Sequence, residues 1–345
     1  MQSPPPIPSR PNAKLPVAVV GCGRMGKLHA RVYSQMPDTH LVGVYDADRG
    51  AAEAAAEEYG TQAFHNLKDL LPMVAAATIA VPTKYHADLA EPFLRRGVAC
   101  LIEKPLAKDV FDCRRIIEAS HRFQPIVQVG HIERFNPAVR AMRKLDIRPQ
   151  FMEVTRISPL TFRSIDVGVV LDMMIHDIDI VLSLAGGSEV TQIDAVGVSV
   201  IGDVEDICNA RLTFANGCVA NITASRLAMK TERKLRVFSQ DAYVSLDYGK
   251  RYGMVAHRGG NVDAIREAVA RIRSGEVDDL SQLNFGDLIN IEELKIDDTE
   301  PIRAELDEFV DAVMHNKPSP VPAEDGMRAV EIATKIVEKI GGKTV

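Results

Sequence analysis

Short apolar segments alternate with helical segments in the first part of the chain. Five runs rich in valine and isoleucine have the length of strands: LPVAVVG, HLVGVYD, ATIAVP, VACLIEKP and PIVQVGH. Between them apolar residues recur at helical spacing, as in RMGKLHARVYSQM, and AAEAAAEEYG ends in a glycine, which is common at a helix C-terminus. Buried strands that alternate with helices predict parallel βαβ units and a doubly wound α/β sheet.

The pattern changes after Phe151 to longer strand-like alternations. These are FMEVTRI, VTQIDAVGVSV, ICNARLTFANGCVANITAS and KLRVFSQDAYVSLDY, with a hairpin signal at Ala215–Gly217. Residues 257–298 combine a charged helix with acidic loops and are interpreted as a surface insertion or an interface arm. PIRAELDEFVDAVMHN and AEDGMRAVEIATKIVEKI predict two amphipathic helices near the end. The second part is therefore predicted to contain a mainly antiparallel sheet.

Composition removes several classes of protein from consideration. The 345 residues are 46% hydrophobic and 26% charged, with a net charge of −6, which gives no electrostatic reason to expect nucleic acid or an anionic membrane. No apolar run reaches the ~18 residues that a membrane span requires. The first 14 residues lack a hydrophobic signal region and contain five prolines, which predicts a disordered leader. With five scattered cysteines and no CxxC pair, a cytoplasmic protein is the simplest expectation.

A glycine-rich turn follows the first apolar run. Gly21, Gly23 and Gly26 form G-x-G-x-x-G between a predicted strand and a predicted helix, and Asp46 ends the next strand 20 residues later. Such glycines let the backbone approach a pyrophosphate, and the helix N-terminus points its N–H groups at the phosphates. An acid at the position of Asp46 binds ribose hydroxyls and repels a 2′-phosphate. The alternative is a structural turn without a ligand. The combination favours bound NAD, with NADP less favoured.

Polar residues gather where two later strands end. VACLIEKP ends in Glu103, Lys104 and Pro105, and AVPTKYH places Pro82, Thr83 and His86 at the end of the preceding strand. Ligands of open α/β sheets bind at the carboxyl edge of the strands. A lysine there can stabilise alkoxide character on a reacting hydroxyl. The alternative is a solvated loop lysine, which the convergence of polar groups makes less favoured.

The apolar segment VLDMMIHDIDIVLSL contains four ionisable residues. On a wheel of about 100° per residue, Asp172, His176 and Asp179 share a stripe about 60° wide, whereas Asp177 lies off it and is expected to cap or pair locally. A metal site is one interpretation, although no clear third ligand is present, and a structural polar network is another. The favoured interpretation makes His176 the acid/base group, with Asp172 orienting it.

These segments together resemble the Gfo/Idh/MocA oxidoreductase family. The motifs are GCGRMG (21–26), AVPTKYH (80–86), EKP (103–105), VGHIERFNP (129–137) and Asp172-x-x-x-His176, in the family's order. The resemblance implies NAD(P)-dependent hydride transfer at a sugar or polyol carbinol. It matches Lys104, Asp172 and His176 to the family's catalytic positions, and it allows a cis Lys104–Pro105 bond.

The resemblance also implies a domain plan and a set of contacts. The expected segments are a leader at 1–14, a Rossmann domain at 15–134, a second α/β domain with a large open sheet at 135–322, and a helix at 323–345 that returns to the Rossmann domain. His131, like His86, is assigned to the cofactor pocket. The predicted cofactor contacts are Gly21, Gly23, Arg24, Met25, Gly26, Asp46, Val81, Pro82, Thr83, His86, Glu103 and Lys104. The predicted substrate contacts are Lys104, Arg134, Asn136, Arg156, Arg163, Asp172 and His176.

The segment from Arg156 to Leu184 and GHIERFNPAV most resemble the branch that acts on UDP-N-acetylglucosamine at C3. The expected substrate is therefore a nucleotide sugar in an amino-sugar pathway of lipid A synthesis, whose diphosphate suits arginine guanidinium groups. An inositol or free-sugar dehydrogenase, an NAD-dependent redox-neutral glycoside hydrolase and a non-catalytic NAD sensor remain as alternatives. No metal is expected. An open sheet of this kind is normally covered, which predicts a homodimer or homotetramer.

Overall fold

A computed structural model describes residues 14–161, 166–258, 262–274 and 289–341. Contacts divide the chain into two units. The first comprises Met1–Phe135, Val170–Ile180 and Thr299–Val345, and the second comprises Asn136–Val169 and Val181–Asp298. Besides the last helix, which was expected to return to it, the first unit thus takes in the segment of Asp172 and His176 and residues 299–322, which the expected limits had placed in the second domain. Local periodicity shows where elements lie but carries no signal for which distant segments pack together.

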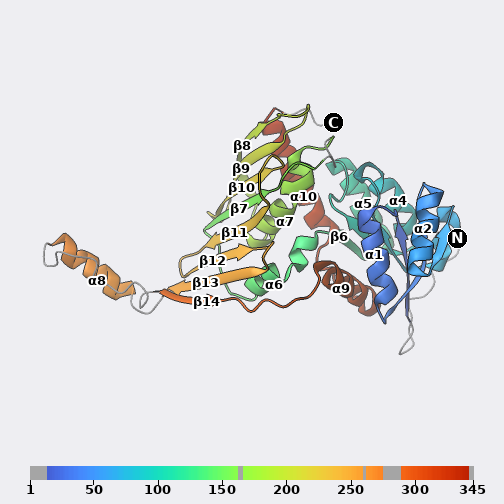
Figure 1. The fold of residues 1–345 in the computed structure, drawn as a ribbon, viewed down its shortest axis with the longest axis horizontal. Coiled ribbons are helices and arrows are strands. Elements are labelled where there is room, and N and C mark those ends of the chain that lie inside the picture. Colours follow the sequence, from blue (N-terminus) through green and yellow to red (C-terminus); the bar gives the residue numbers. More distant parts are fainter. Residues whose placement is uncertain (1–13, 162–165, 259–261, 275–288, 342–345) are drawn as a thin grey trace. The chain divides into compact units, whose positions relative to one another are not determined.

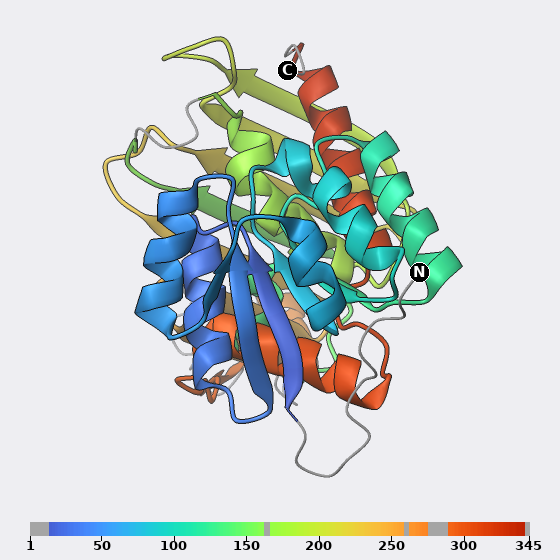
Figure 2. The same cartoon turned by 90° about the vertical axis from the view of Figure 1, so that its right-hand side faces the viewer.

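The first unit contains the predicted doubly wound parallel sheet (Figure 2), and its six strands have the order β3-β2-β1-β4-β5-β6. The strands are β1 (Leu15–Val20), β2 (Thr39–Tyr45), β3 (Gln62–Phe64), β4 (Ala76–Ile79), β5 (Ala99–Glu103) and β6 (Val127–Gly130). The helices are α1 (Arg24–Gln35), α2 (Arg49–Tyr59), α3 (Leu67–Leu70), α4 (His86–Leu94), α5 (Val110–Phe123), α9 (Pro301–His315) and α10 (Ala323–Lys339). The fold class is confirmed, and the three-residue β3 is an addition that no apolar run had indicated.

Helices cover both faces of this sheet. On one face α1 packs against α2 and α9, and on the other α4 packs against α5, which also contacts α10. Double coverage explains why the strands are continuous apolar runs, since all four residues of β4 are buried. Helix ends follow the expected chemistry: Asp48 caps α2 by accepting from two backbone N–H groups, and Gly60 ends it in the left-handed region.

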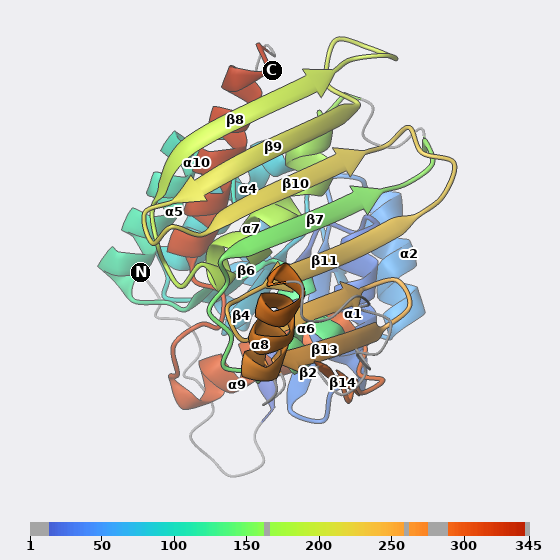
Figure 3. The same cartoon turned by 90° about the vertical axis from the view of Figure 1, so that its left-hand side faces the viewer.

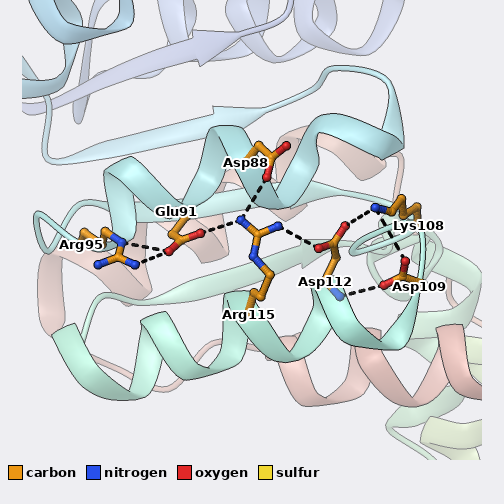
Figure 4. Close-up of polar contacts among 7 residues, drawn as sticks. All are labelled: Asp88, Glu91, Arg95, Lys108, Asp109, Asp112 and Arg115. Atoms are coloured by element: carbon orange, nitrogen blue, oxygen red, sulfur yellow. Dashed lines mark hydrogen bonds and ion pairs between the residues drawn. The ribbon is translucent and has the colours of Figure 1, made fainter.

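An ion-pair network joins α4 and α5 on the outer surface of the first unit (Figure 4). Arg115 contacts Asp112 and Glu91 at 2.8 Å and Asp88 at 3.0 Å. Lys108 and Arg95 extend the network through Asp112 and Glu91. Hydrogen bonds from the arginines lower the pKa of Glu91, so its carboxylate stays ionised. The network crosses between the two helices and holds them side by side.

The second unit contains the predicted mainly antiparallel sheet (Figure 3), with eight strands in the order β14-β13-β12-β11-β7-β10-β9-β8. The strands are β7 (Phe151–Ile157), β8 (Val190–Val198), β9 (Ile207–Phe214), β10 (Val219–Ser225), β11 (Glu232–Phe238), β12 (Ala242–Asp247), β13 (Tyr252–Arg258) and β14 (Ile289–Glu293). Only the β7–β10 pair is parallel among the described pairs. The expected hairpin is present, with Gly217 at a φ of 86° between β9 and β10.

The second unit also contains the helices α6 (Pro137–Arg143) and α8 (Val262–Arg273), whereas α7 (Ile175–Leu184) begins in the first unit and ends in the second; all three are labelled in Figure 1. α6 packs on β12 and β13. Alternate residues of β9 are buried, which marks one covered face of the sheet. Within residues 257–298 the structure describes α8 and β14, and β14 pairs with β13 as a further strand. No helix in the described ranges is long and apolar enough to cross a membrane.

Candidate active site

The glycine turn between β1 and α1 is shaped by contacts that exclude side chains. A Cβ on Gly21, whose φ is +101°, would lie 2.4 Å from the carbonyl oxygen of Ala80, and one on Gly26 would lie 1.7 Å from that of Gly21. Around Gly23, by contrast, a Cβ would meet nothing within 4 Å. Gly23 is the N-cap of α1 and makes no side-chain cap hydrogen bond, so no capping side chain competes with a ligand for the first N–H groups of this helix. This cradle fits a pyrophosphate.

Asp46 lies beside this turn, directly after β2. Its Oδ2 accepts from the backbone N–H of Cys22 at 2.6 Å, and its Oδ1 accepts from that of Asp48 at 2.9 Å. The two bonds fix the carboxylate next to the glycine turn, where it suits ribose hydroxyls. Arg24 is exposed and Met25 half-buried on the first turn of α1. The residues therefore fit NAD, and the individual contacts stay predictions.

The residues that follow β4 are partly exposed and partly buried. Pro82 is exposed, and Val81 and Thr83 are half-buried. His86 is buried, with Nε2 2.9 Å from the Val81 carbonyl oxygen and Nδ1 2.9 Å from that of Pro105. Burial lowers its pKa. Its described contacts thus join two strand ends, and its cofactor contact remains a prediction.

Lys104 projects toward the segment that carries the predicted catalytic residues. Its peptide bond to Pro105 is cis, as the resemblance implied. The Nζ donates to the backbone carbonyl of Asp172 at 2.7 Å and lies 3.6 Å from Oδ1 of the same residue. Both side chains keep partial exposure, 20% for Lys104 and 36% for Asp172. The structure therefore brings Lys104 and Asp172 together, and His176 follows four residues later in the first turn of α7.

The helical wheel drawn from the sequence does not hold along this segment. Val170–Met174 is a turn of π-helix, and the α-helical α7 begins only at Ile175. The i→i+5 bonding of a π turn changes the angle between successive side chains. The carboxylates of the predicted stripe also have different partners: Asp172 faces Lys104, whereas Asp179, within the regular α7, is buried and binds Arg134. Asp177, placed off the stripe, is also buried.

Arg134 has carboxylate partners within the first unit. Its Nε and Nη2 donate to the two oxygens of Asp179 at 2.7 and 2.6 Å, and its Nη1 donates to Asp325 at 2.8 Å. The side chain is 6% exposed. These contacts attach α7 and α10 to the turn after β6. They give the guanidinium a structural task, so its predicted contact with a substrate diphosphate draws no support from them.

The other predicted substrate residues lie in different parts of the structure. Asn136 caps α6, with its Oδ1 accepting from the N–H of Ala138 at 3.1 Å. Arg156 is buried on β7. Arg163 lies outside the described residues. Their substrate roles stay predictions.

Sequence reasoning missed a buried polar layer next to Lys104. Glu103, expected to contact the cofactor, is buried, and its Oε1 accepts from or shares a proton with His29 Nε2 at 2.9 Å. Glu305 on α9 is fully buried near it. The available signal was strand parity, because Glu103 follows Ala99 and Leu101 on one face of β5. His131, assigned to the cofactor pocket, is likewise buried, with its Nε2 3.9 Å from Asp179.

The structure thus combines a dinucleotide-shaped turn with a lysine held against a helix that carries acid/base residues. Among the described residues no group of three or more His, Cys, Asp or Glu side chains is arranged for a metal ion. The class of protein that these features define is an oxidoreductase with an NAD-binding Rossmann domain.

Comparisons with known proteins identify the family within this class. Residues 15–131 match the model described as "Oxidoreductase family, NAD-binding Rossmann fold", and residues 161–345 match "Oxidoreductase family, C-terminal alpha/beta domain". The chain belongs to the Gfo/Idh/MocA family of oxidoreductases. The family predicted from the motifs is therefore confirmed.

The chain is also similar to individual dehydrogenases. The chain is 32% identical over 320 residues to a UDP-N-acetylglucosamine 3-dehydrogenase of Acidithiobacillus ferrooxidans, covering 92% of this chain and 95% of that protein. A solved structure of this dehydrogenase superposes with a TM-score of 0.84 over 95% of this chain and 98% of the other, at 29% identity. An inositol 2-dehydrogenase of Rhizobium meliloti is 34% identical over 61% of this chain and 68% of its own. Levoglucosan dehydrogenase with NADH shares the fold, with a TM-score of 0.80 at 21% identity, covering 95% of this chain and 97% of that one.

Proposed function

We propose that the protein oxidises a secondary hydroxyl of a nucleotide sugar with NAD, and that the substrate is UDP-N-acetylglucosamine, oxidised at C3 to the 3-keto sugar. The observation that carries this proposal is the 2.7 Å bond from Lys104 Nζ to Asp172, which holds the lysine against the segment that bears His176. The near full-length similarity to a UDP-N-acetylglucosamine 3-dehydrogenase supports the substrate.

Each residue has a distinct task in this reaction. The imidazole of His176 takes the proton of the reacting hydroxyl, a task for which histidine is the side chain that enzymes use most often. Asp172, four residues earlier, orients the imidazole and stabilises its cationic form. The ammonium of Lys104 donates to the reacting oxygen and stabilises its developing negative charge. When bound, NAD supplies the hydride acceptor, held by the glycine turn and Asp46.

The cofactor preference follows from Asp46. Its carboxylate is fixed beside the turn by two backbone N–H groups, and its charge is unfavourable beside a 2′-phosphate. NAD is therefore the proposed cofactor.

The experiment incubates purified protein with NAD and UDP-N-acetylglucosamine and follows NADH absorbance. Matched reactions contain myo-inositol, glucose and the C4 epimer UDP-N-acetylgalactosamine. We expect NADH only with UDP-N-acetylglucosamine, and product analysis should show the 3-keto sugar. No signal with any nucleotide sugar would refute the substrate, and strong reduction of NAD by inositol would favour the function of the Rhizobium relative.

The setting of the protein is proposed on the same basis. The 3-keto product is a precursor for a 3-amino sugar of lipid A, and the enzyme would act in the cytoplasm on a small molecule rather than on nucleic acid or membrane. Light scattering coupled to gel filtration should find a homodimer or homotetramer, because the broad sheet of the second unit leaves apolar side chains such as Val196 and Val198 exposed on β8. A monomer at micromolar concentration would contradict this assembly.

A further inference from the structure

A layer of polar side chains lies inside the first unit between the sheet and two helices. Strand parity puts Thr78 with Ala76, and Glu103 with Leu101, on the face that α1 and α9 cover. The members of this buried layer are Tyr33, His29, Thr78, Glu103, Gln128 and Glu305. They stand where the neighbouring apolar core would otherwise continue, so each polar atom needs a hydrogen-bond partner there.

One arm of the layer is a hydrogen-bonded chain that ends at Glu103. Tyr33 Oη lies 3.0 Å from Thr78 Oγ1, which lies 3.4 Å from His29 Nδ1, and His29 Nε2 lies 2.9 Å from Glu103 Oε1. When the His29 imidazole is neutral with its proton on Nε2, every donor of this chain has an acceptor: the Tyr33 hydroxyl donates to Thr78, the Thr78 hydroxyl donates to Nδ1, and Nε2 donates to Glu103. Glu103 at its end is then an ionised acceptor. Burial alone would raise the pKa of Glu103, but His29 and the charge of Lys104 hold it below its usual range.

The other arm contains Gln128 and Glu305. Gln128 Nε2 donates to the backbone carbonyl of Glu305 at 3.2 Å, which fixes the amide orientation because a carbonyl only accepts. The remaining atoms are Gln128 Oε1 and both carboxyl oxygens of Glu305, and none has a hydrogen-bond partner within the described part of the chain. If Glu305 were ionised, all three would be acceptors with no donor. A protonated Glu305 supplies the missing donor, directly or through a buried water.

The charges around Glu305 agree with this assignment. Burial raises its pKa well above the usual range, and the like charge of Glu103 raises it further. Tyr33, which faces it from α1, stays neutral because burial raises the pKa of the phenol. Two acids whose pKa values are pushed in opposite directions divide into one ionised and one protonated group.

We propose that Glu305 is a positioning residue for Lys104, held as a neutral carboxylic acid so that Glu103 alone carries negative charge behind that lysine. Glu103 directly precedes Lys104 in the chain and acts on its ammonium. A second buried carboxylate would repel the first, loosen Glu103 from His29, and move the lysine that follows it. This inference rests on the proposed role of Lys104, but the protonation of Glu305 is testable without any substrate.

The substitution that tests the protonation is Glu305→Gln, which replaces the neutral acid by a neutral group of the same shape. Above the usual carboxyl range the folded wild type keeps a proton that the unfolded chain releases, so its stability falls as pH rises toward the folded pKa of Glu305. The E305Q protein lacks this loss. We expect its melting temperature to exceed that of wild type, with a gap that widens from mildly acidic to mildly alkaline pH. The exposed Asp307→Asn on the same helix is the matched control and should show no widening.

Infrared spectroscopy gives a second readout. Wild type at neutral pH should show the carbonyl band of a protonated carboxylic acid, and the band should vanish in E305Q but persist in D307N. Absence of the band from wild type, or an E305Q protein that is less stable than wild type, would overturn the assignment. Both measurements stand whether or not the nucleotide-sugar activity is found.

Kinetics test the link to Lys104. E305Q should keep kcat within about twofold of wild type, since a neutral group is retained. Glu103→Gln should lower kcat on the order of 10²-fold with little change in the KM for NAD, as expected for a displaced catalytic group. An E305Q loss as large as that of E103Q would show that the ionised form is needed, and would refute the proposal.

Discussion

The contact between Arg134 and Asp179 predicts a large and specific loss of stability. The two side chains are 6% and 1% exposed, and two N–H groups of the guanidinium donate to the two carboxylate oxygens at 2.7 and 2.6 Å. Arg134→Met leaves the Asp179 carboxylate buried without its main partner. Removing one member of such a pair costs about 3–5 kcal/mol. Asp325, whose side chain is 33% exposed, loses a partner too, but water screens it and the added cost is about 0–1 kcal/mol.

The assay is urea unfolding of wild type, R134M, Asp179→Leu and the double variant R134M/D179L. Each single variant should lose about 3–5 kcal/mol of unfolding free energy, whereas the double variant should lose less than either, because no buried charge is left unpaired. Arg115→Met is the matched control. Arg115 also contacts several carboxylates but is 32% exposed, so its loss should be about 1 kcal/mol or less (Figure 4).

His131 gives this prediction a pH signature. Burial lowers its pKa, Asp179 raises it and Arg134 lowers it, while its Nε2 lies 3.9 Å from the Asp179 carboxylate. Without Arg134 the folded-state pKa of His131 should rise, and a protonated imidazole can then replace part of the lost charge. The R134M loss should therefore be smaller at mildly acidic pH than at mildly alkaline pH. Equal losses for R134M and R115M, or additive losses in the double variant, would refute this account of the buried pair.

Three further substitutions test the proposed site. His176→Ala should lower kcat by about 10²–10⁴-fold with little change in the KM for NAD, measured by initial rates, and near wild-type turnover would exclude it as the base. Asp46→Asn should raise the kcat/KM for NADP relative to that for NAD, because a charge that repels the 2′-phosphate is removed; an unchanged ratio would show that another residue sets the preference. Gly26→Ala should abolish NAD binding by calorimetry or prevent folding, because its Cβ would lie 1.7 Å from the Gly21 carbonyl oxygen, while Gly23→Ala should fold normally.

The parallel sheet was predictable because its strands are buried on both faces. A strand such as Ala76–Ile79 is continuously apolar, and the glycine turn and Asp46 follow strands directly, so periodicity and spacing placed them. Lys104 was predictable for the same reason, since it ends a buried strand. Which helices pack on which face was not predictable. Glu305 lies some 200 positions after Glu103 in the sequence, and only the return of α9 onto the sheet brings it into the polar layer.

The arginines show a second limit of the sequence. A guanidinium in a motif segment suits a diphosphate and a buried carboxylate equally well, because both accept bidentate hydrogen bonds. Arg134 was assigned to the diphosphate, a contact that stays a prediction, whereas the structure shows its Nε and Nη2 donating to Asp179 and its Nη1 to Asp325. The choice depended on the location of Asp179, which the helical wheel had assigned to an open stripe.

One part of that assignment failed because a turn of the backbone is irregular, which changes the angle between Asp172 and the later residues; the burial of Asp179, which shares the regular helix α7 with His176, follows instead from its pairing with Arg134. The wheel assumed about 100° per residue throughout, but Val170–Met174 bonds as a π-helix. Local propensity does not specify a π turn, which persists where surrounding contacts support it. Here Lys104 Nζ donates to the carbonyl of Asp172 inside that turn. Lys104 and the π turn therefore form one arrangement, because the carbonyl of Asp172 in that turn accepts a hydrogen bond from the lysine. The α-helix that follows contains both His176 and Asp179, and Asp179 pairs with Arg134.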